Sequence, residues 1–316
     1  MKWRLLGVTV AATIGIGAAA PAPALLEPNP WLGRRVLHIA HQGGENEYPS
    51  NTMYAYRSSV ELFDTDVVEL DVHATADGQI VAIHDATVDR TTNGTGRIDQ
   101  MTLAQVQALD AAYWFVPGYG TTHSRPPSEY IYRGVATGQT APPPGFTVAD
   151  FRIPTLHEVL QRYPDRFINI EIKATVPDTT PYEDKLAALL REFGRDDDVI
   201  VVSFLDHAVE LFKVWAPEIH TATATVETAA FYATAYDALP GAPNPRYVAM
   251  QVPMVFEGIT VLTEDFVANA HANGLAVHAW TIDDPDDMCD LIAMGVDGIM
   301  TNEPSDLRDI LDNGCD

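Results

Sequence analysis

Strand and helix patterns alternate along most of the chain, and this alternation constrains the fold more than any other sequence feature. Short apolar runs typical of buried strands alternate with longer segments whose apolar residues recur at helical spacing. Such alternation predicts parallel strands joined by crossover helices. About eight strands in a chain of this length fit a closed (β/α)8 TIM barrel better than an open sheet. No Gly-x-Gly-x-x-Gly motif follows the first strand, which disfavours a dinucleotide-binding sheet.

The predicted elements begin with a strand at 36–41 and a helix at 52–63, which Ser50 or Asn51 is expected to cap. The remaining strands are predicted at 67–73, 80–85, 167–173, 199–204, 219–225, 247–252, 276–282 and 296–301. The remaining helices are predicted to start at Thr102, to open at 154–156, and to cover 182–194, 206–215, 227–237, 263–273 and 285–294.

The first 24 residues have the pattern of a secretory signal peptide. Lys2 and Arg4 precede a long apolar run, and the small residues Ala22-Pro23-Ala24 offer a cleavage site after Ala24. Cleavage leaves residues 25–316 as one barrel domain, secreted to an extracellular or periplasm-like space, and an uncleaved membrane anchor is the alternative. No later segment is apolar for long enough to span a bilayer.

Charge and cysteine content narrow the partners. The formal net charge of −25 disfavours nucleic acid and anionic membranes as partners and favours cations. The chain has two cysteines, Cys289 and Cys315. In an exported protein they either form a disulfide or remain separate thiols, and the sequence leaves both possibilities open.

From about residue 111 to 151 the periodicity disappears, and this stretch is predicted to be a long insertion in the barrel domain. Long ordered loops in compact domains are usually functional. The insertion is rich in aromatic residues, namely Tyr113, Trp114, Phe115, Tyr119, Tyr130, Tyr132 and Phe146. Near a barrel mouth these side chains would either bind an acyl or alkyl chain or pack the insertion onto the barrel.

The segment Val67-Val68-Glu69-Leu70-Asp71-Val72-His73 carries the first chemical signal. Alternate strand residues point to opposite faces, so Glu69, Asp71 and His73 share one face of this predicted strand. Two buried neighbouring carboxylates need compensating charge, and their hard oxygen ligands suit Ca²⁺ or Mg²⁺. A solvent-exposed acidic face is the alternative interpretation. His73 is interpreted as supporting the site rather than binding a metal.

Other polar residues lie at or near the ends of predicted strands, where barrel enzymes place their chemistry. They are His41, His84, Glu171, Lys173 and Trp280. Each residue has a structural explanation when taken alone, for example a salt bridge for Glu171 and Lys173. Their convergence on one rim is what favours an active site.

These residues resemble the signatures of the glycerophosphodiester phosphodiesterase family. The resemblance rests on His41 with Gly43, Pro49, Asn51 and Thr52, on 69–73 with Asp77-Gly78 and His84-Asp85, on 89–96, on 171–173, on 279–281 and on 298–304. It extends from about residue 37 to 308, and it implies a metal-dependent phosphoric diester hydrolase on a TIM barrel.

The resemblance also implies a role for each matching residue. Glu69, Asp71 and Glu171 would hold one divalent cation, Ca²⁺ or Mg²⁺. His41 and His84 would be the general acid and base, in an order that the sequence leaves open. Lys173 would neutralise a phosphate oxygen, and Trp280 would pack on the substrate. Histidine suits both proton transfers near neutral pH.

Two positions depart from the family pattern, which usually has Arg after the first His and Glu before the Asn-Thr pair. Here Gln42 and Ser50 occupy these positions. Gln42 is expected to contact the substrate as a neutral donor, which grips phosphate less strongly than a guanidinium group. The same loop carries Glu45 and Glu47, which would either attract a cationic head group or remain solvated.

The sequence therefore predicts a secreted phosphodiesterase whose substrates include lysophospholipids cleaved on the head-group side. This lysophospholipase D reaction gives lysophosphatidic acid or its cyclic form together with choline or ethanolamine. The alternative is release of sn-glycerol 3-phosphate from small deacylated diesters. A non-catalytic binding protein fits less well because both histidines and all three carboxylates are present. A two-carboxylate glycosidase fits less well because Glu69 and Asp71 share one strand face, which suits a metal better than an opposed acid and nucleophile.

Overall fold

Eight parallel strands form the centre of the molecule in the computed structural model, which describes residues 29–33, 35–235 and 247–315. The expected signal peptide at 1–24 lies outside these described residues. The strands are β1 (Leu37–Ala40), β2 (Val67–Ala74), β6 (Phe167–Ile172), β7 (Val199–Val202), β8 (His220–Thr221), β9 (Ala249–Val252), β12 (Ala276–Ala279) and β13 (Gly298–Thr301).

The strands close into a barrel. Their order around the sheet is β8-β7-β6-β2-β1-β13-β12-β9. Strands β8 and β9 meet through a parallel bridge between Ala222 and Ala249, where the Thr223 N–H donates to the Ala249 carbonyl at 3.1 Å. The Val248 N–H donates in the same seam to the Thr221 carbonyl at 3.0 Å. The closed parallel sheet confirms the predicted (β/α)8 fold.

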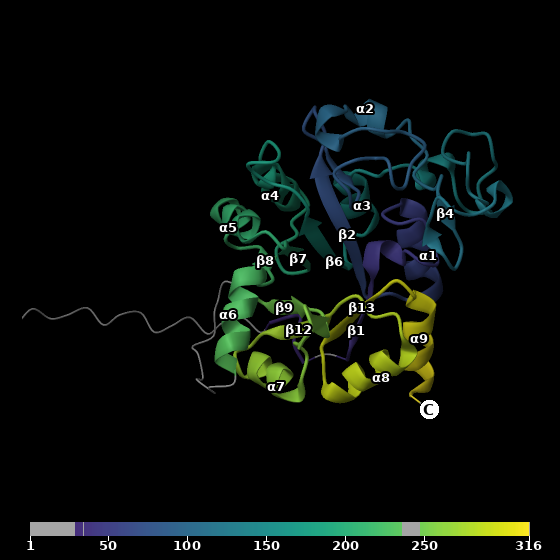
Figure 1. Cartoon of the computed structure of the whole chain (residues 1–316). Coiled ribbons are helices and arrows are strands. Elements are labelled where there is room, and N and C mark those ends of the chain that lie inside the picture. Colours follow the sequence, from purple (N-terminus) through teal and green to yellow (C-terminus); the bar gives the residue numbers. More distant parts are fainter. Residues whose placement is uncertain (1–28, 34, 236–246, 316) are drawn as a thin grey trace, which may run out of the picture.

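Helices surround this barrel on its outer face (Figure 1). They are α1 (Met53–Phe63), α3 (Leu156–Arg162), α4 (Glu183–Glu192), α5 (Asp206–Trp215), α6 (Thr225–Ala235), α7 (Glu264–Ala272), α8 (Pro285–Met294) and α9 (Pro304–Asn313). Their apolar faces pack on the outward side chains of the strands, which removes both from water. Within the described residues, no helix is long and apolar enough to cross a membrane.

Strand β2 shows the predicted alternation of faces. Val68, Leu70 and Val72 belong to the apolar cluster between sheet and helices. Glu69 and Asp71 point the other way, into the barrel, and are 2% and 0% exposed. The acidic face of this strand is therefore buried, and the alternative of a solvent-exposed acidic strand is wrong.

Several predicted boundaries need correction. Thr52 caps α1, because its hydroxyl accepts the Ala55 N–H, so neither Ser50 nor Asn51 is the cap. The strand expected at 219–225 shortens to β8, because α6 already begins at Thr225. The predicted end of that helix at 237 falls outside the described residues. Helix α9 was not predicted.

The remaining elements extend the loops between barrel strands. After β2 the chain forms β3 (Ile80–Ala82) and α2 (Leu103–Val106). The 111–151 segment holds the short strands β4 (Phe115–Val116) and β5 (Gly120–Thr121) beside 3-10 turns. After β9 a hairpin of β10 (Val255–Phe256) and β11 (Ile259–Thr260) projects from the barrel.

A disulfide joins Cys289 on α8 to Cys315 beyond α9. Of the two possibilities that the sequence leaves open, the structure therefore has the paired form. The bond ties the C-terminal segment to the preceding helix, 26 residues earlier in the chain.

Candidate active site

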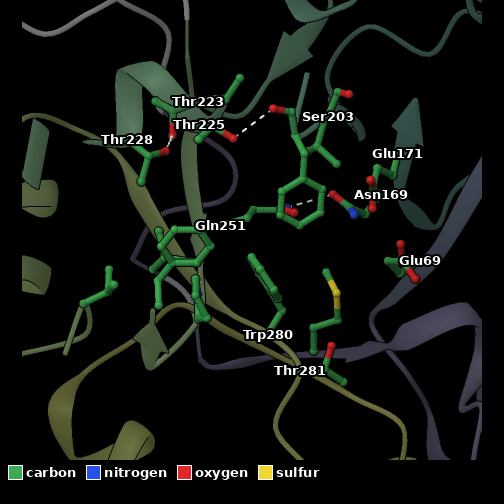
Figure 2. Close-up of a pocket in the computed structure, with 18 of the residues that line it drawn as sticks. Glu69, Asn169, Glu171, Ser203, Thr223, Thr225, Thr228, Gln251, Trp280 and Thr281 are labelled. Carbon is green, nitrogen blue, oxygen red and sulfur yellow. Dashed lines mark hydrogen bonds between the residues drawn. The ribbon is translucent and has the colours of Figure 1, made fainter. Parts of the chain in front are cut away.

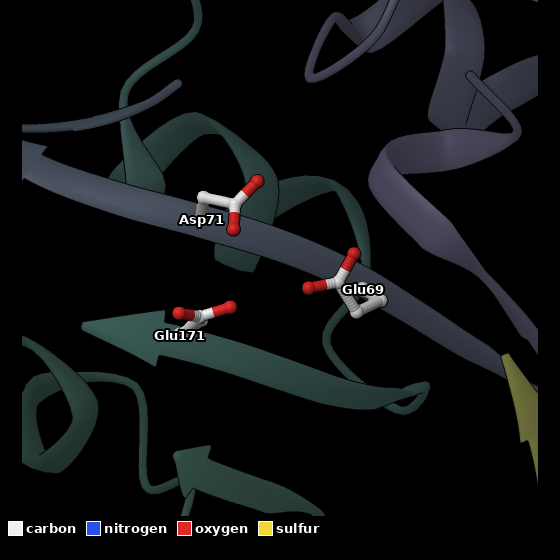
Figure 3. Close-up of side chains that lie close together, drawn as sticks. All are labelled: Glu69, Asp71 and Glu171. Carbon is white, nitrogen blue, oxygen red and sulfur yellow. The ribbon is translucent and has the colours of Figure 1, made fainter. Parts of the chain in front are cut away.

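Three carboxylates meet inside the barrel near the carboxyl ends of two adjacent strands. Glu69 and Asp71 come from β2, and Glu171 comes from β6, where it lies directly beside Asp71 in the strand register (Figure 3). One oxygen from each carboxylate lies within 4.8 Å of the others. The parallel pairing of β2 and β6 thus assembles the three residues that the sequence predicts as ligands.

The electrostatics of this cluster favour a bound cation. Burial and the neighbouring Asp71 raise the pKa of Glu69 well above its ordinary value, and the same causes raise the pKa of Glu171 to about 7. Lys173 is the only cation in contact, with Nζ 3.0 Å from Glu171 and 3.5 Å from Asp71, among the residues that the structure describes. Three carboxylates against one ammonium leave an excess of negative charge.

A metal ion fits this arrangement. The Asp71 Oδ1 atom is buried and makes no hydrogen bond, and the Lys173 ammonium lies 3.5 Å from it. A cation bound at this oxygen would add the close contact that a buried carboxylate oxygen needs. The other oxygen of this aspartate, Oδ2, accepts from Asn51 Nδ2 at 2.9 Å, and Glu69 Oε2 accepts from the Gln42 N–H at 2.7 Å. These outer contacts fix both carboxylates in place, as is common around metal sites. Oxygen donors alone suit Ca²⁺ or Mg²⁺ and do not distinguish between them.

His41 and His84 lie on the same rim but have different partners. His41 follows β1, and its Nδ1 lies 2.6 Å from Asn302 Oδ1. The Asn302 side chain in turn donates to Asp283 Oδ2 at 2.8 Å. His84 follows β3, and its Nδ1 lies 2.7 Å from Asp85 Oδ1. One imidazole is thus oriented by a neutral amide and the other by a carboxylate.

This difference in partners changes the acidity of His84. The hydrogen bond to Asp85 raises the pKa of His84 above its ordinary value, although burial partly opposes this. The other ring nitrogen, Nε2, lies 3.1 Å from Lys173 Nζ. His84 therefore connects the lysine of the carboxylate cluster with the Asp85 side chain.

Gln42 and His73 lie near the site, but neither is among the described residues that line its cavity. Gln42 is buried with a left-handed backbone (φ 52°), and its side-chain Nε2 lies 3.4 Å from His41 Nε2. His73 Nε2 lies 3.1 Å from the His84 carbonyl oxygen. His73 thus contacts the backbone of the loop that carries His84. This contact agrees with a supporting role for His73 rather than a role as a metal ligand.

A cavity of about 450 Å³ opens beside the carboxylates. His41, Glu69, His84, Glu171 and Lys173 line one end of it. Figure 2 shows Glu69 and Glu171 at this end and three threonines, Thr223, Thr225 and Thr228, at the far end, with Gln251 and Asn169 between them. Trp280 lies on the cavity wall, where the sequence predicts a substrate contact.

None of the insertion aromatics lines this cavity, so the cavity gives no support to the interpretation that they bind a hydrocarbon chain. Tyr132 and Phe146 pack on Tyr54 of α1. Tyr113, Trp114 and Tyr130 surround the Arg133 guanidinium at 4.0–4.7 Å. The contacts with Tyr54 pack the insertion on the barrel, as the other interpretation of the sequence proposed, and those with Arg133 hold the insertion together.

The two extra loop acids are also engaged within the protein. Glu45 forms an ion pair with Arg90 at 2.6 Å. Glu47 accepts hydrogen bonds from the Ser305 N–H at 2.9 Å and from its hydroxyl at 2.6 Å. Both carboxylates therefore have partners within the protein, an arginine for Glu45 and a serine for Glu47. Attraction of a cationic head group stays a prediction.

Asn51, Asp85 and Asn302 fall within the family-like motifs, but the sequence assigned none of them a role in the active site. The structure shows that each one holds a site side chain, namely Asp71, His84 and His41. Phe204 was missed altogether. It lies 5.2 Å from Trp280, ring centre to ring centre, on the cavity wall. Only its position as the last residue of the predicted strand 199–204 hinted at a place on this rim.

Comparison with known proteins agrees with this geometry. The model of the glycerophosphoryl diester phosphodiesterase family matches residues 41–306. A glycerophosphodiester phosphodiesterase of Caldanaerobacter subterraneus subsp. tengcongensis is 31% identical over 89% of this chain and 99% of its own length. A putative glycerophosphodiester phosphodiesterase of Bacillus subtilis is 32% identical over 84% of this chain and 94% of its own length.

Solved structures share the fold at lower identity. A phosphodiesterase of Oleispira antarctica, solved with the product sn-glycerol-3-phosphate, aligns with a TM-score of 0.60 at 23% identity. The alignment covers 87% of this chain and 96% of that one. A glycerophosphoryl diester phosphodiesterase domain of Mycobacterium tuberculosis aligns with a TM-score of 0.68 at 16% identity, over 87% of this chain and 98% of that domain.

Proposed function

The chain belongs to the glycerophosphoryl diester phosphodiesterase family, and from this premise we propose that it hydrolyses glycerophosphodiesters with the help of one divalent cation. As a member of this family the protein is a phosphoric diester hydrolase. The observation that carries the proposal is the meeting of two buried carboxylates, the partly buried Glu171, one lysine and two histidines at one end of a single cavity.

Glu69, Asp71 and Glu171 would hold the cation, Ca²⁺ or Mg²⁺. Such an ion supplies positive charge where negative charge develops on the phosphate oxygens. Lys173 neutralises a further phosphate oxygen, since its ammonium group already lies at the edge of the carboxylate cluster. Trp280 packs on the substrate, and the Gln42 amide beside His41 offers a neutral donor.

His41 and His84 transfer the two protons of the reaction. One takes the proton of the nucleophile, which is water for direct hydrolysis or the neighbouring glycerol hydroxyl for the cyclic product, and the other protonates the leaving alkoxide. Both line the same end of the cavity as the carboxylates, so both face a phosphate bound there. Asn302 and Asp85 hold the two rings through Nδ1, which directs each Nε2 toward the site.

The simplest substrates are small deacylated diesters, which would release sn-glycerol 3-phosphate. The relationship to named glycerophosphodiester phosphodiesterases supports this reaction, and so does the sn-glycerol-3-phosphate in the Oleispira antarctica structure. It is the better supported of the two substrate classes.

Lysophospholipids are the second candidate substrates. Cleavage on the head-group side would give lysophosphatidic acid or its cyclic form, together with choline or ethanolamine. The observation that favours them is the cavity, which extends from the carboxylates along a largely apolar wall. We also propose that residues 1–24 direct secretion and are then removed.

Product analysis tests the function. Purified protein is incubated with glycerophosphocholine and with lysophosphatidylcholine, each with Ca²⁺, with Mg²⁺ and with EDTA. Choline release that EDTA abolishes supports a metal-dependent phosphodiesterase, and the phosphorylated product separates the two substrate classes. Turnover that persists after complete removal of divalent cations would contradict the proposed metal dependence.

Replacing Asp85 with asparagine is expected to shift one limb of the pH–rate profile to lower pH. In the wild type, the hydrogen bond to Asp85 raises the pKa of His84, and a neutral amide removes the charge behind that effect. Because His84 then loses its proton at lower pH, the alkaline limb moves if His84 is the acid, and the acidic limb moves if it is the base.

The measurement is kcat/KM across the neutral pH range for both proteins. Asp64→Asn is the matched control, because that side chain is 76% exposed and lies at the end of α1. It should leave both limbs in place. An Asp85→Asn profile identical to that of the wild type would show that Asp85 does not set the acidity of a catalytic group.

A further inference from the structure

The cavity beside the carboxylates has two chemically different parts. Its charged residues and both of its histidines gather at one end. The rest of the wall carries no ionisable acid, lysine or arginine among the described residues that line it. The total volume of about 450 Å³ lies in the range that binds whole organic ligands of drug size, roughly 300–1,000 Å³. A glycerol phosphate group alone leaves much of this space unfilled.

The uncharged part, here called the apolar arm, is built from three separate segments. It comprises Val202 at the end of β7 and Phe204 just beyond it, Ala229 and Tyr232 on α6, and Phe256, Ile259 and Val261 on and after the β10–β11 hairpin, with Trp280 facing them. The Tyr232 hydroxyl donates to the Thr260 carbonyl at 3.3 Å, which connects α6 to the hairpin. The arm is therefore a wall held together by the protein itself.

The polar side chains along the arm are already satisfied. The Thr223 and Thr228 hydroxyls bond each other at 2.8 Å, and the Thr225 hydroxyl donates to the Phe204 carbonyl at 2.8 Å. Gln251 Nε2 donates to Asn169 Oδ1 at 2.8 Å. These contacts appear as dashed lines in Figure 2. A ligand in the arm thus meets mainly carbon, which favours hydrocarbon over a sugar or a charged group.

The outer rim of the arm exposes large apolar side chains. Phe204, Phe256 and Ile259 are 51%, 50% and 53% exposed, and all three also line the cavity. A group of exposed apolar side chains that continues into a cavity marks a binding site for an apolar ligand. The net charge of −25 makes an anionic ligand chain less favourable than a neutral one.

We propose that the apolar arm binds the hydrocarbon chain of a monoacyl or monoalkyl glycerophosphodiester while its phosphate lies at the carboxylate end. The inference rests on the proposed function. It places the binding site for the hydrocarbon chain at α6 and the β10–β11 hairpin rather than at the 111–151 insertion. Each methylene group that leaves water for the arm should raise kcat/KM by about fourfold until the arm is filled.

The test uses choline release from glycerophosphocholine and from octanoyl, dodecanoyl and palmitoyl lysophosphatidylcholine, at concentrations below micelle formation. The wild type should prefer longer chains. In Phe256→Ser/Ile259→Ser, the ratio of kcat/KM for the palmitoyl substrate to kcat/KM for glycerophosphocholine should fall at least tenfold. Val214→Ser is the control, because Val214 is a 75% exposed apolar residue of α5 outside the cavity. Its ratio should equal that of the wild type.

A second variant acts by filling the arm. Ala229→Trp keeps the wall apolar but occupies its space, so the preferred chain should become shorter. This variant keeps the proposal testable if the hairpin variant does not fold. Wild-type rates that do not depend on chain length, or preference ratios that survive in both variants, would overturn the assignment. Hydrolysis of glycerophosphocholine alone would overturn it while the proposed function stands. Hydrolysis of neither substrate would instead refute the proposed function.

Discussion

Replacing either His84 or His41 with glutamine is expected to lower kcat by about 10²–10⁴-fold, with a much smaller change in KM. Glutamine keeps a polar group of similar reach, but it cannot exchange a proton near neutral pH. Both imidazoles line the carboxylate end of the cavity, and neither belongs to the carboxylate cluster itself. Loss of either ring should therefore remove a proton transfer and leave the cation site intact.

Steady-state kinetics on glycerophosphocholine measure kcat and KM. Thermal unfolding with and without Ca²⁺ measures whether the cation still binds. Each variant should keep the wild-type increase in melting temperature on addition of the cation. His157→Gln is the control, since His157 lies exposed on α3 and packs edge-on against Phe193. Its kcat should stay at the wild-type value. A variant of His41 or His84 with nearly full kcat would exclude that histidine as a catalytic acid or base.

Replacing Glu171 with glutamine is expected to remove both activity and stabilisation by divalent cations. Glu171 is one of three carboxylates that share the buried cluster, so its loss takes away a charged oxygen ligand. For the wild type, a cation at 100 times its Kd should add about 2.7 kcal/mol to the free energy of unfolding. The variant should gain much less at the same concentration, and its rate should resemble that of the EDTA-treated wild type.

The same substitution should change the pH dependence of the cation-free protein. Burial and Asp71 raise the pKa of Glu171 to about 7, above its value in the unfolded chain. A carboxyl group with a raised folded-state pKa makes the fold less stable as pH increases through that interval. The cation-free wild type should therefore lose stability relative to Glu171→Gln as pH rises from about 4.5 to about 7.

Chemical unfolding across this pH interval, in the presence of EDTA, measures the effect. Glu158→Gln removes the same charge from an exposed capping box, where glutamine can replace glutamate, and it serves as the control. It should keep the wild-type response to cations. If Glu171→Gln is still stabilised by Ca²⁺ or Mg²⁺ to the full extent, Glu171 is not a ligand.

Local patterns in the sequence predicted the barrel and the buried acids well. The period of two in 67–73 placed Glu69 and Asp71 on one face, and their burial confirms it. Regular alternation of strand and helix predicted the closed parallel sheet. Boundaries were less accurate because tertiary contacts decide them. For example, Asn51 is committed to Asp71 and Tyr56, so the cap of α1 falls to Thr52.

Contacts between segments far apart in the sequence could not be predicted from local patterns. The pairing of His41 with Asn302 spans 261 positions, and its geometry follows from the adjacency of β1 and β13 in the closed barrel. The aromatic composition of the insertion suggested a binding site for a hydrocarbon chain as one of two interpretations. In the structure its rings pack on Tyr54 and on Arg133. Composition alone therefore did not show what these rings contact.

The sequence by itself determined the barrel, the buried acidic strand and the set of residue types that the chemistry needs. These follow from periodicity and motif spacing, which are local properties of the chain. Only the tertiary structure decided which groups meet, because register and barrel closure set distances between residues far apart in sequence. In this way β2 and β6 bring Asp71 beside Glu171, and α6 and the β10–β11 hairpin place an apolar wall next to them.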